Sequence, residues 1–234
     1  MIVRESARWT TQVAENRNRP RMSEAFLALF TPRYKRRTIV NASLMLVSII
    51  GLWAGSVYVP LSVTQIALRE GRTAAEAARF ASYGLMVLST GTILGCLILP
   101  LLAERYGRRM TMAIYFAIMF VSISVGFGYV FYLGMNALPR FFAVLFLLGI
   151  GGANFAMYTL WLPEQYSTEC RASAFAFATS AARFAGAGIT FLVGAGVSYF
   201  GTIGIPVALT SIAFLLGMFL LPLGEETRGK PLPA

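Results

Sequence analysis

Arg183 is the side chain best placed to do chemistry in this sequence, because it is a lone cation in a small and apolar stretch. It follows Arg171 by twelve residues, a step of about 18 Å along an α-helix. The hydrocarbon core of a bilayer is about 30 Å thick, so if Arg171 marks one membrane surface, Arg183 lies near the midplane. An arginine there costs roughly 2.5–3.5 kcal/mol on insertion scales and usually faces a bundle interior or a wet cavity. Arg183 is therefore a candidate for binding an anionic ligand.

A second interpretation of Arg183 is a cation paired with a buried carboxylate. The apolar stretches contain no Asp or Glu, so such a partner would lie on another chain. The same absence leaves no paired intramembrane carboxylates for acid–base chemistry, and the sequence has no histidine and no nucleotide-binding glycine loop. The sequence therefore does not indicate an enzyme, and it predicts neither a metal site nor a cofactor.

The composition indicates an integral membrane protein. Of the 234 residues, 57% are hydrophobic and 13% are charged. The net charge of +10 is compatible either with nucleic-acid binding or with membrane topology. Nine of the twenty Lys and Arg fall in residues 1–37 and most others lie in short segments between apolar runs. This distribution favours topology, so nucleic acid is not an expected partner. The two cysteines, Cys96 and Cys170, indicate no disulfide or metal framework.

The chain divides into a basic cytoplasmic segment (residues 1–37), a transmembrane bundle (38–223) and a cytoplasmic tail (224–234). Six apolar stretches in the bundle are long enough to span a bilayer. They cover residues 38–68, 80–103, 109–132, 140–161, 171–199 and 204–223. The first is too long for one straight helix, and we expect Pro60 to kink or break it near its far end. The glycines of Gly149-Ile-Gly-Gly152 are expected to soften the fourth.

Charge counting predicts the orientation of these spans. The segments on the side of the two termini carry nine, three, one and two Lys and Arg, and those on the other side carry three, one and none. The excess of fifteen over four places both termini in the cytoplasm, as an even number of spans requires. We therefore expect a multi-pass protein of an inner or plasma membrane.

Three charged motifs follow the second, fourth and sixth apolar stretches. The first is Glu104-Arg-Tyr-Gly-Arg-Arg109, in which Gly107 can end a helix in a left-handed conformation. The second is Pro163-Glu-Gln-Tyr-Ser-Thr-Glu-Cys-Arg171, and the third is Gly224-Glu-Glu-Thr-Arg-Gly-Lys-Pro-Leu232. Charged residues at helix ends usually mark the interface or contact anionic lipid, so each motif alone is a weak signal. The order and topological positions of all three are specific.

Together the motifs resemble the carboxy-terminal half of a major facilitator superfamily transporter, and the sugar-porter-like, organic-ion and aromatic-acid branches are closest. Glu104 stands where this family usually has Asp, while Glu225 and Ala7 replace prolines of two further family motifs. The resemblance covers essentially the whole chain. It implies an all-α integral membrane fold of six transmembrane helices, equivalent to one half of a twelve-helix fold. Because Arg4–Trp9 resembles the segment that follows helix six of twelve, the amino-terminal half is expected to be missing.

The resemblance also implies a role for the charged motifs, as a cytoplasmic latch of salt bridges and helix-end contacts that holds two halves together. Some partners of these charges would then lie in the other half. The alternative is that the charges only determine topology and contact lipid. The expected latch residues are Glu104, Arg105, Gly107, Arg108, Arg109, Glu164, Arg171, Glu226 and Arg228.

The family architecture implies that the first, second, fourth and fifth spans line a central cavity. Helical spacing gives a polar face around Arg183 on the fifth span and a stripe of Asn, Tyr and Trp on the fourth. On the first span, Trp53 and Tyr58 lie close to a region that we expect to unwind before Pro60. Such side chains also serve as helix–helix contacts or interfacial belts. The candidate substrate-binding residues are Arg183, Asn154, Tyr158, Trp161, Thr179, Asn41, Trp53 and Tyr58.

The pattern Arg171-x11-Arg183 resembles that of organic-anion and aromatic-acid carriers, in which the inner arginine attracts an anionic substrate. A guanidinium binds a carboxylate bidentately, and a low-dielectric cavity strengthens the attraction. We therefore predict half of a secondary active transporter for a small organic anion or carboxylated metabolite. By analogy with the family, it would be proton-coupled and would work by alternating access.

Two alternatives remain open. A sugar/proton symporter half is disfavoured because sugar sites need several amides, and only Asn41, Asn154 and Gln65 are available. The other alternative is a truncated half-transporter without transport activity of its own, since alternating access rocks two halves around a midplane site. Besides the lipid bilayer and a small-molecule substrate, the expected partner is therefore the missing amino-terminal six-helix half or a second half-transporter.

Overall fold

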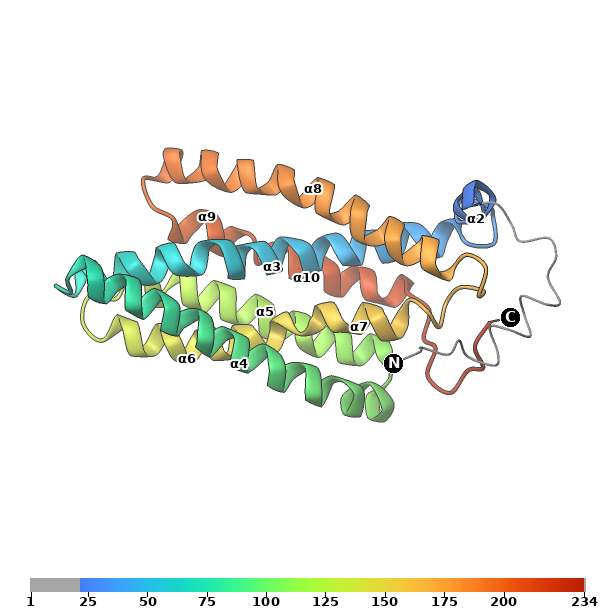
Figure 1. The fold of residues 1–234 in the computed structure, drawn as a ribbon, viewed down its shortest axis with the longest axis horizontal. Helices are drawn as coiled ribbons and strands as arrows, with labels where there is room; N and C mark the ends of the chain where they lie inside the picture. Colours follow the sequence, from blue (N-terminus) through green and yellow to red (C-terminus); the bar gives the residue numbers. More distant parts are fainter. Residues whose placement is uncertain (1–21, 234) are drawn as a thin grey trace, which may run out of the picture.

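The computed structural model describes residues 22–233, except for the side chains of residues 22, 52 and 54–56. The basic residues before position 22, including the motif at Arg4–Trp9, lie outside the described residues. Within the described range the fold is all-α. Long helices run side by side along the molecule, and α2 (Met22–Ala28) and the tail after residue 223 lie at the same end (Figure 1).

The four longest helices form the frame of the bundle. They are α3 (Lys35–Arg69), α4 (Ala74–Tyr106), α5 (Arg108–Gly128) and α8 (Arg171–Phe200). The turn between α3 and α4 ends in a capping box, in which Thr73 and Glu76 satisfy each other's backbone N–H groups. α3 lies centrally and contacts α4, α6, α8 and α10, so the buried core is built around it.

The first expected span differs from the sequence prediction at Pro60. Of the expected kink or break at Pro60, the break, with an unwound region before it, is wrong, because α3 is helical without interruption from Lys35 to Arg69. A proline removes one backbone hydrogen bond and strains the preceding turn. Val59 and Val63 on either side of Pro60 are fully buried, and this packing keeps the chain helical.

The fourth span is two helices, α6 (Ala137–Gly152) and α7 (Asn154–Trp161), separated at Ala153. The interruption directly follows the glycine-rich segment that was expected to soften this span. Backbone approach explains the glycines: a Cβ on Gly149 would collide with the carbonyl oxygen of Leu88 in α4, and one on Gly91 would collide with that of Phe146. The helices α4 and α6 therefore pack backbone to backbone, as small residues allow in lipid.

The remaining elements close the bundle. They are the 3-10 helix η1 (Val130–Tyr132), α9 (Gly204–Leu209), α10 (Ile212–Leu220) and the 3-10 helix η2 (Leu221–Leu223). The sixth span is thus divided near Thr210 and Ser211, which the sequence did not predict. The Thr210 hydroxyl donates to the Val207 carbonyl (2.6 Å), and the hydroxyls of Ser124 and Ser211 lie 2.9 Å apart. These contacts occupy polar groups at the division.

Five helical segments in the described part of the chain are long and apolar enough to cross a membrane. They are Ala74–Tyr106, Arg108–Tyr132, Ala137–Trp161, Arg171–Phe200 and Gly204–Leu223. They match the second to sixth expected spans. The helix α3 is not among the five, although its 35 residues extend about 52 Å. Its assignment as a sixth span stays a prediction.

Candidate functional site: a charged cluster at one end of the bundle

The turn between α4 and α5 sets up the site. Gly107 separates the two helices with φ 89° and ψ 167°, a conformation that is essentially restricted to glycine. A Cβ at this position would also lie 2.8 Å from a carboxylate oxygen of Glu226. Gly107 therefore allows both the tight turn and the close approach of the tail. We expected a left-handed conformation at this helix end. The φ of Gly107 is positive, as expected, but its ψ is that of an extended residue.

The carboxylate of Glu226 caps the first turn of α5. It accepts hydrogen bonds from the backbone N–H groups of Arg108 (2.9 Å) and Arg109 (3.0 Å), and from those of Thr227 and Arg228 (both 3.1 Å). An anion at a helix N-terminus is favoured by the unpaired N–H groups and the helix dipole. Partial burial opposes ionisation, but these backbone hydrogen bonds outweigh it and lower the pKa of Glu226. The tail is therefore attached to α5 through a charged carboxylate.

Arg108 is the centre of the cluster, and only 5% of its surface is exposed. Its Nε and Nη2 donate to the two oxygens of Glu164 (2.9 and 2.7 Å), and Nη2 also contacts Glu104 (2.9 Å). Such a bidentate, charge-assisted pair is both stronger and more directional than a neutral hydrogen bond. The Thr227 hydroxyl donates to the same Glu164 carboxylate. One arginine thus connects α4, α5, the segment after α7 and the tail.

A second arginine brings the start of α3 into the same region. Arg37 forms an ion pair with Glu225 (2.6 Å), and its Nη1 donates to the carbonyl oxygen of Gln165 (2.9 Å). The backbone carbonyl of Glu225 also accepts from the indole N–H of Trp161 (2.8 Å), and its carboxylate pairs with Lys230 (3.2 Å). The charged cluster, which we define as Arg37, Glu104, Arg108, Glu164, Glu225 and Glu226, therefore connects α3, α4, α5, the segment after α7 and the tail at this end of the bundle.

The structure brings most of the expected latch residues together. Arg105 and Arg171 differ, because Arg105 lies over the Tyr106 ring (5.4 Å) and Arg171 donates to the Tyr166 carbonyl (3.3 Å). Arg228 is exposed and takes part through its backbone N–H. Whether the cluster works as a latch between two halves stays a prediction. The residues brought together are Glu104, Gly107, Arg108, Arg109, Glu164 and Glu226.

Sequence reasoning missed Arg37 and Glu225 of the cluster, and also Thr227 and Gln165, which bind to cluster residues. Arg37 was counted only as a topology determinant, and Glu225 only as a departure from a family motif. Thr227 lies beside Glu226 in the third motif, so adjacency was the available signal. No signal in the sequence indicated Gln165, because its partner Asn41 is 124 positions away along the chain. The Asn41 Nδ2 donates to the Gln165 Oε1 (3.0 Å).

Half of the expected substrate-binding residues lie within the packed interior. Asn41 binds Gln165, and Tyr158 exchanges a hydrogen bond with Ser48 (2.9 Å). Trp161 donates to the tail. Asn154 donates to the Gly151 carbonyl (2.7 Å) at the division between α6 and α7, while its buried Oδ1 has no partner among the described residues. These four side chains are at most 2% exposed.

The other half lie on α3 and α8. Tyr58 donates to the Thr190 carbonyl (3.4 Å) and Trp53 packs beside Gly186, so both side chains connect the two helices. Thr179 is buried and donates to the Phe175 carbonyl of its own helix (2.8 Å). Contact of these eight residues with substrate stays a prediction.

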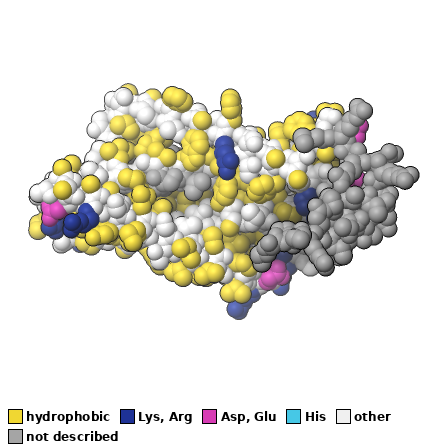
Figure 2. All heavy atoms as spheres, in the orientation of Figure 1, with side chains coloured by type: hydrophobic (Ala, Val, Ile, Leu, Met, Phe, Trp, Pro, Cys, Tyr) yellow, Lys and Arg dark blue, Asp and Glu magenta, His cyan; other side chains and the backbone are white. Residues whose placement is uncertain are grey.

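Arg183 is exposed on α8. In the part of the chain that the structure describes, no hydrogen bond or ion pair holds its guanidinium. It precedes Thr190 by seven residues, so both lie within about 20° of each other around the helix. Hydrophobic side chains cover much of the molecule between its ends, while charged side chains gather towards the ends (Figure 2). An uncompensated arginine at mid-helix is therefore exposed on a largely apolar surface.

Comparisons with known proteins identify the fold. No family model matches the sequence, and no curated protein matches it. Fourteen chains of solved structures do match. One is the xylose transporter XylE from E. coli in an inward-open conformation, with a TM-score of 0.68 and 19% sequence identity. The match covers 81% of this chain and 48% of that chain, so this chain spans about half the length of the structure it matches. The described residues thus have an all-α fold similar to about half of that transporter, and five of their helical segments are long and apolar enough to cross a membrane.

Proposed function

We propose that this chain is half of a secondary transporter for a small organic anion, coupled to protons and working by alternating access. The observation that carries the proposal is Arg183, an exposed guanidinium without a partner among the described residues, on a membrane-spanning helix of a transporter fold. An uncompensated charge at this depth is costly in lipid unless it meets water, a counter-charge or a ligand. A carboxylated substrate supplies the counter-charge only while it is bound.

The burial of the spans supports docking of a second six-helix half. In the apolar 18-residue stretch of each candidate span, only 17% is buried in α4 and 28% in α8. The corresponding share is 39–50% in the other three candidate spans. Among the five candidate spans, these two are the least buried, and Arg183 lies on one of them. A second half placed against them would enclose Arg183 in a central cavity. The partner is then an amino-terminal-type six-helix half or a second copy of this chain, and both termini face the cytoplasm.

The exposed arginine favours an anion over a sugar. One solved structure with a similar fold is a xylose transporter, which makes sugar the alternative substrate class. Hydroxyl recognition needs several free amides near the site, but Asn41 binds Gln165 and the Asn154 amide N–H donates to the Gly151 carbonyl. The third amide, Gln65, lines a separate cavity at one end of the bundle. Arg183, by contrast, keeps its whole guanidinium fork available for a carboxylate. A half that assembles without transporting anything is the remaining alternative.

The test is uptake by cells that carry the variant in place of their own copy, so that any partner half is present. Arg183→Ala should reduce uptake of labelled benzoate by roughly 10–100-fold at equal membrane abundance, since charge-assisted hydrogen bonds contribute about 1.5–3 kcal/mol each. Arg183→Lys should also be impaired, because a point charge does not reproduce the fork. Arg140→Ala, which removes an exposed arginine near one end of the bundle, is the control.

Three results are decisive. Benzoate uptake that is unchanged in Arg183→Ala rules out the substrate contact. Loss of xylose uptake in Arg183→Ala, with benzoate uptake unchanged, supports the sugar alternative. A wild-type protein that takes up neither probe, at normal abundance in the membrane, favours the half without transport activity.

A further inference from the structure

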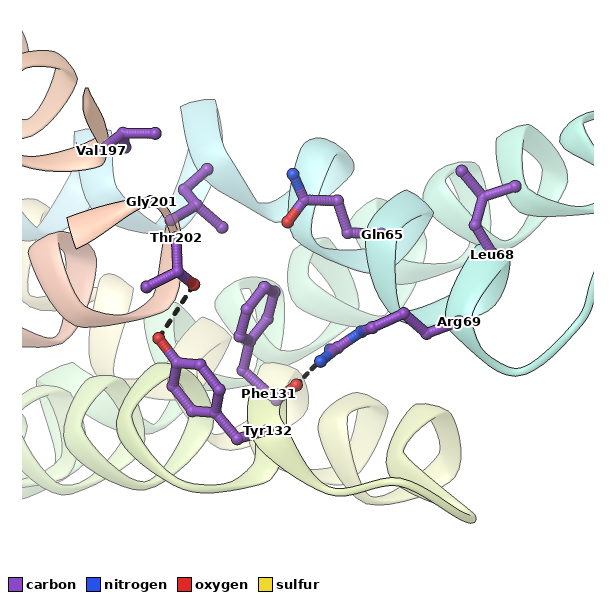
Figure 3. Close-up of a pocket in the computed structure, with 9 residues that line it drawn as sticks. Gln65, Leu68, Arg69, Phe131, Tyr132, Val197, Gly201 and Thr202 are labelled. Atoms are coloured by element: carbon purple, nitrogen blue, oxygen red, sulfur yellow. Dashed lines mark hydrogen bonds between the residues drawn. The ribbon is translucent and has the colours of Figure 1, made fainter. Parts of the chain in front are cut away.

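At the end of the bundle opposite the charged cluster lies a cavity of about 350 Å³. It is formed by the last turns of α3, by η1 and by the turn between α8 and α9 (Figure 3). Cavities of this size hold small ligands. Arg183 lies about 26 Å along α8 from Phe200, which ends that helix next to the cavity. The cavity is therefore separate from the surface that carries Arg183.

Two polar side chains project into this region from the same face of α3. Gln65 and Arg69 are four residues apart, so they are neighbours on the helix. The amide of Gln65 extends towards Gly201 and Thr202, whereas the guanidinium of Arg69 extends towards Phe131 (Figure 3). The structure shows no hydrogen-bond partner for the Gln65 amide within residues 22–233. It is therefore available to a ligand.

Arg69 is held in place without being neutralised. One of its Nη2–H groups donates to the backbone carbonyl of Phe131, and its guanidinium lies over the ring of the same residue, 4.7 Å from the centroid. A guanidinium has five N–H groups, so most of its fork remains free. The neighbouring Glu70 does not compensate it, because its carboxylate accepts from the N–H groups of Ala137 (2.8 Å) and Leu138 (3.1 Å) at the start of α6.

The rest of the lining combines polar groups with apolar side chains. The Tyr132 hydroxyl lies 3.0 Å from that of Thr202 and also accepts from the Ile205 N–H (3.0 Å), which joins η1 to the α8–α9 turn. Leu68 and Val197 add apolar surface. One fixed positive charge, one free amide and apolar walls match a singly charged carboxylate with a compact apolar body better than a multiply charged phosphate.

We propose that this cavity is a binding site for a small monocarboxylate, held by Arg69 and Gln65 against Phe131. The site goes beyond the proposed function, because it shares no residue with the surface around Arg183 and lies entirely within this chain. Its ligand would bind whether or not a second half is present. Carboxylate binding there would join α3 to η1 and to the α8–α9 turn.

The experiment measures binding of 4-fluorobenzoate by fluorine NMR to the full 234-residue chain in a neutral detergent. All variants also carry Arg183→Ala, so that the proposed transport site does not contribute. Arg69→Gln should weaken binding by about tenfold or more, the loss expected for a charge-assisted hydrogen bond. Gln65→Leu should weaken it while leaving the charge intact. Arg72→Gln, which removes a nearby cation that lies over Phe80 outside the cavity, should bind like the parent.

Any of four outcomes would overturn the proposal. The first two are that the parent does not bind 4-fluorobenzoate, or that Arg69→Gln binds it as tightly as the parent does. The other two are that Arg72→Gln weakens binding as much as Arg69→Gln does, or that neutral 4-fluorobenzamide binds as tightly as the acid. Displacement by inorganic phosphate at the concentration at which benzoate displaces the probe would overturn the carboxylate class. The result is independent of the uptake test, because binding here does not depend on Arg183 or on transport.

Discussion

At the residue scale, Arg108 shows why a buried charge needs all of its partners. Its side chain is 6% exposed and that of Glu164 is 16% exposed, so neither is well solvated. Replacing a buried ion pair as a whole can be nearly neutral, but removing one partner leaves an uncompensated charge. Glu164 also accepts from Thr227. Its loss therefore affects α5 and the tail together.

Glu164→Ala should consequently destabilise the protein by roughly 3–5 kcal/mol, the cost of breaking a buried pair from one side. Thermal unfolding in detergent measures the effect as a lower Tm. Lys230→Ala provides the matched control, because the Lys230–Glu225 pair is 55% and 31% exposed and should contribute at most about 1 kcal/mol. Equal effects of the two substitutions would mean that the Arg108–Glu164 pair is solvated and contributes no more than a surface pair.

Glu226 makes the attachment of the tail dependent on pH. Its pKa in the folded protein lies below its ordinary value of 4.5, so its contribution to stability is complete above about pH 5 and is lost as the pH falls through the folded-state pKa. Tm should therefore fall below pH 5, and it should fall less in Glu226→Gln, which starts from a lower Tm at neutral pH. A wild-type Tm that changes with pH in parallel with that of the variant would contradict this role.

At the element scale, the contact between α4 and α6 depends on glycine. A Cβ on Gly149 meets backbone atoms of α4, including the Thr92 nitrogen at 3.0 Å, and a backbone cannot move aside as the end of a side chain can. Glycine also weakens a helix by about 1 kcal/mol relative to alanine. Close packing and a divided fourth span thus follow from the same residues.

Gly149→Ala should lower the Tm by separating the two helices, with a cost of about 1–3 kcal/mol typical of overpacking. Gly152→Ala is the control from the same turn, because its Cβ would meet nothing closer than the Thr92 hydroxyl at 4.0 Å. This second substitution should leave the Tm unchanged or raise it. If both variants behave alike, backbone approach is not what selects glycine at position 149.

At the scale of the whole molecule, the ends of the bundle differ in charge and in what they hold. The end that carries the tail has the charged cluster, and the other has the Arg69 cavity. The excess of Lys and Arg on the tail side predicts that this side is cytoplasmic. The cavity would then open to the outside, where it meets solutes before they reach the membrane.

Cysteine labelling tests this orientation in a background without Cys96 and Cys170. Met135→Cys, in the exposed turn before α6, should react in intact cells with a maleimide that does not cross membranes. Gly229→Cys, in the tail, should react only after permeabilisation. Both positions are exposed, so accessibility does not bias the comparison. The reverse pattern would place both termini outside and would refute the charge-based topology.

The sequence by itself determined five apolar helical segments and the charged motifs of this protein. Apolar runs of sufficient length predict membrane helices whatever packs beside them, because each helix makes all of its backbone hydrogen bonds within itself in lipid. The structure found five of the six expected spans as apolar helices. The glycine-rich segment also predicted the weakness at Ala153, since helix propensity is a local property.

Only the tertiary structure decided where the side chains of these helices point and what they bind. Asn41 and Tyr158 follow a polar stripe that suits a cavity equally well, but their partners lie 124 and 110 positions away and place them inside the packing. Pro60 predicted a kink or a break, yet α3 runs through it without a break, with Val59 and Val63 buried beside it. The Arg69 cavity joins three segments that are far apart in the sequence. Local sequence sets propensity and hydropathy, whereas pairing between distant segments depends on how the helices pack.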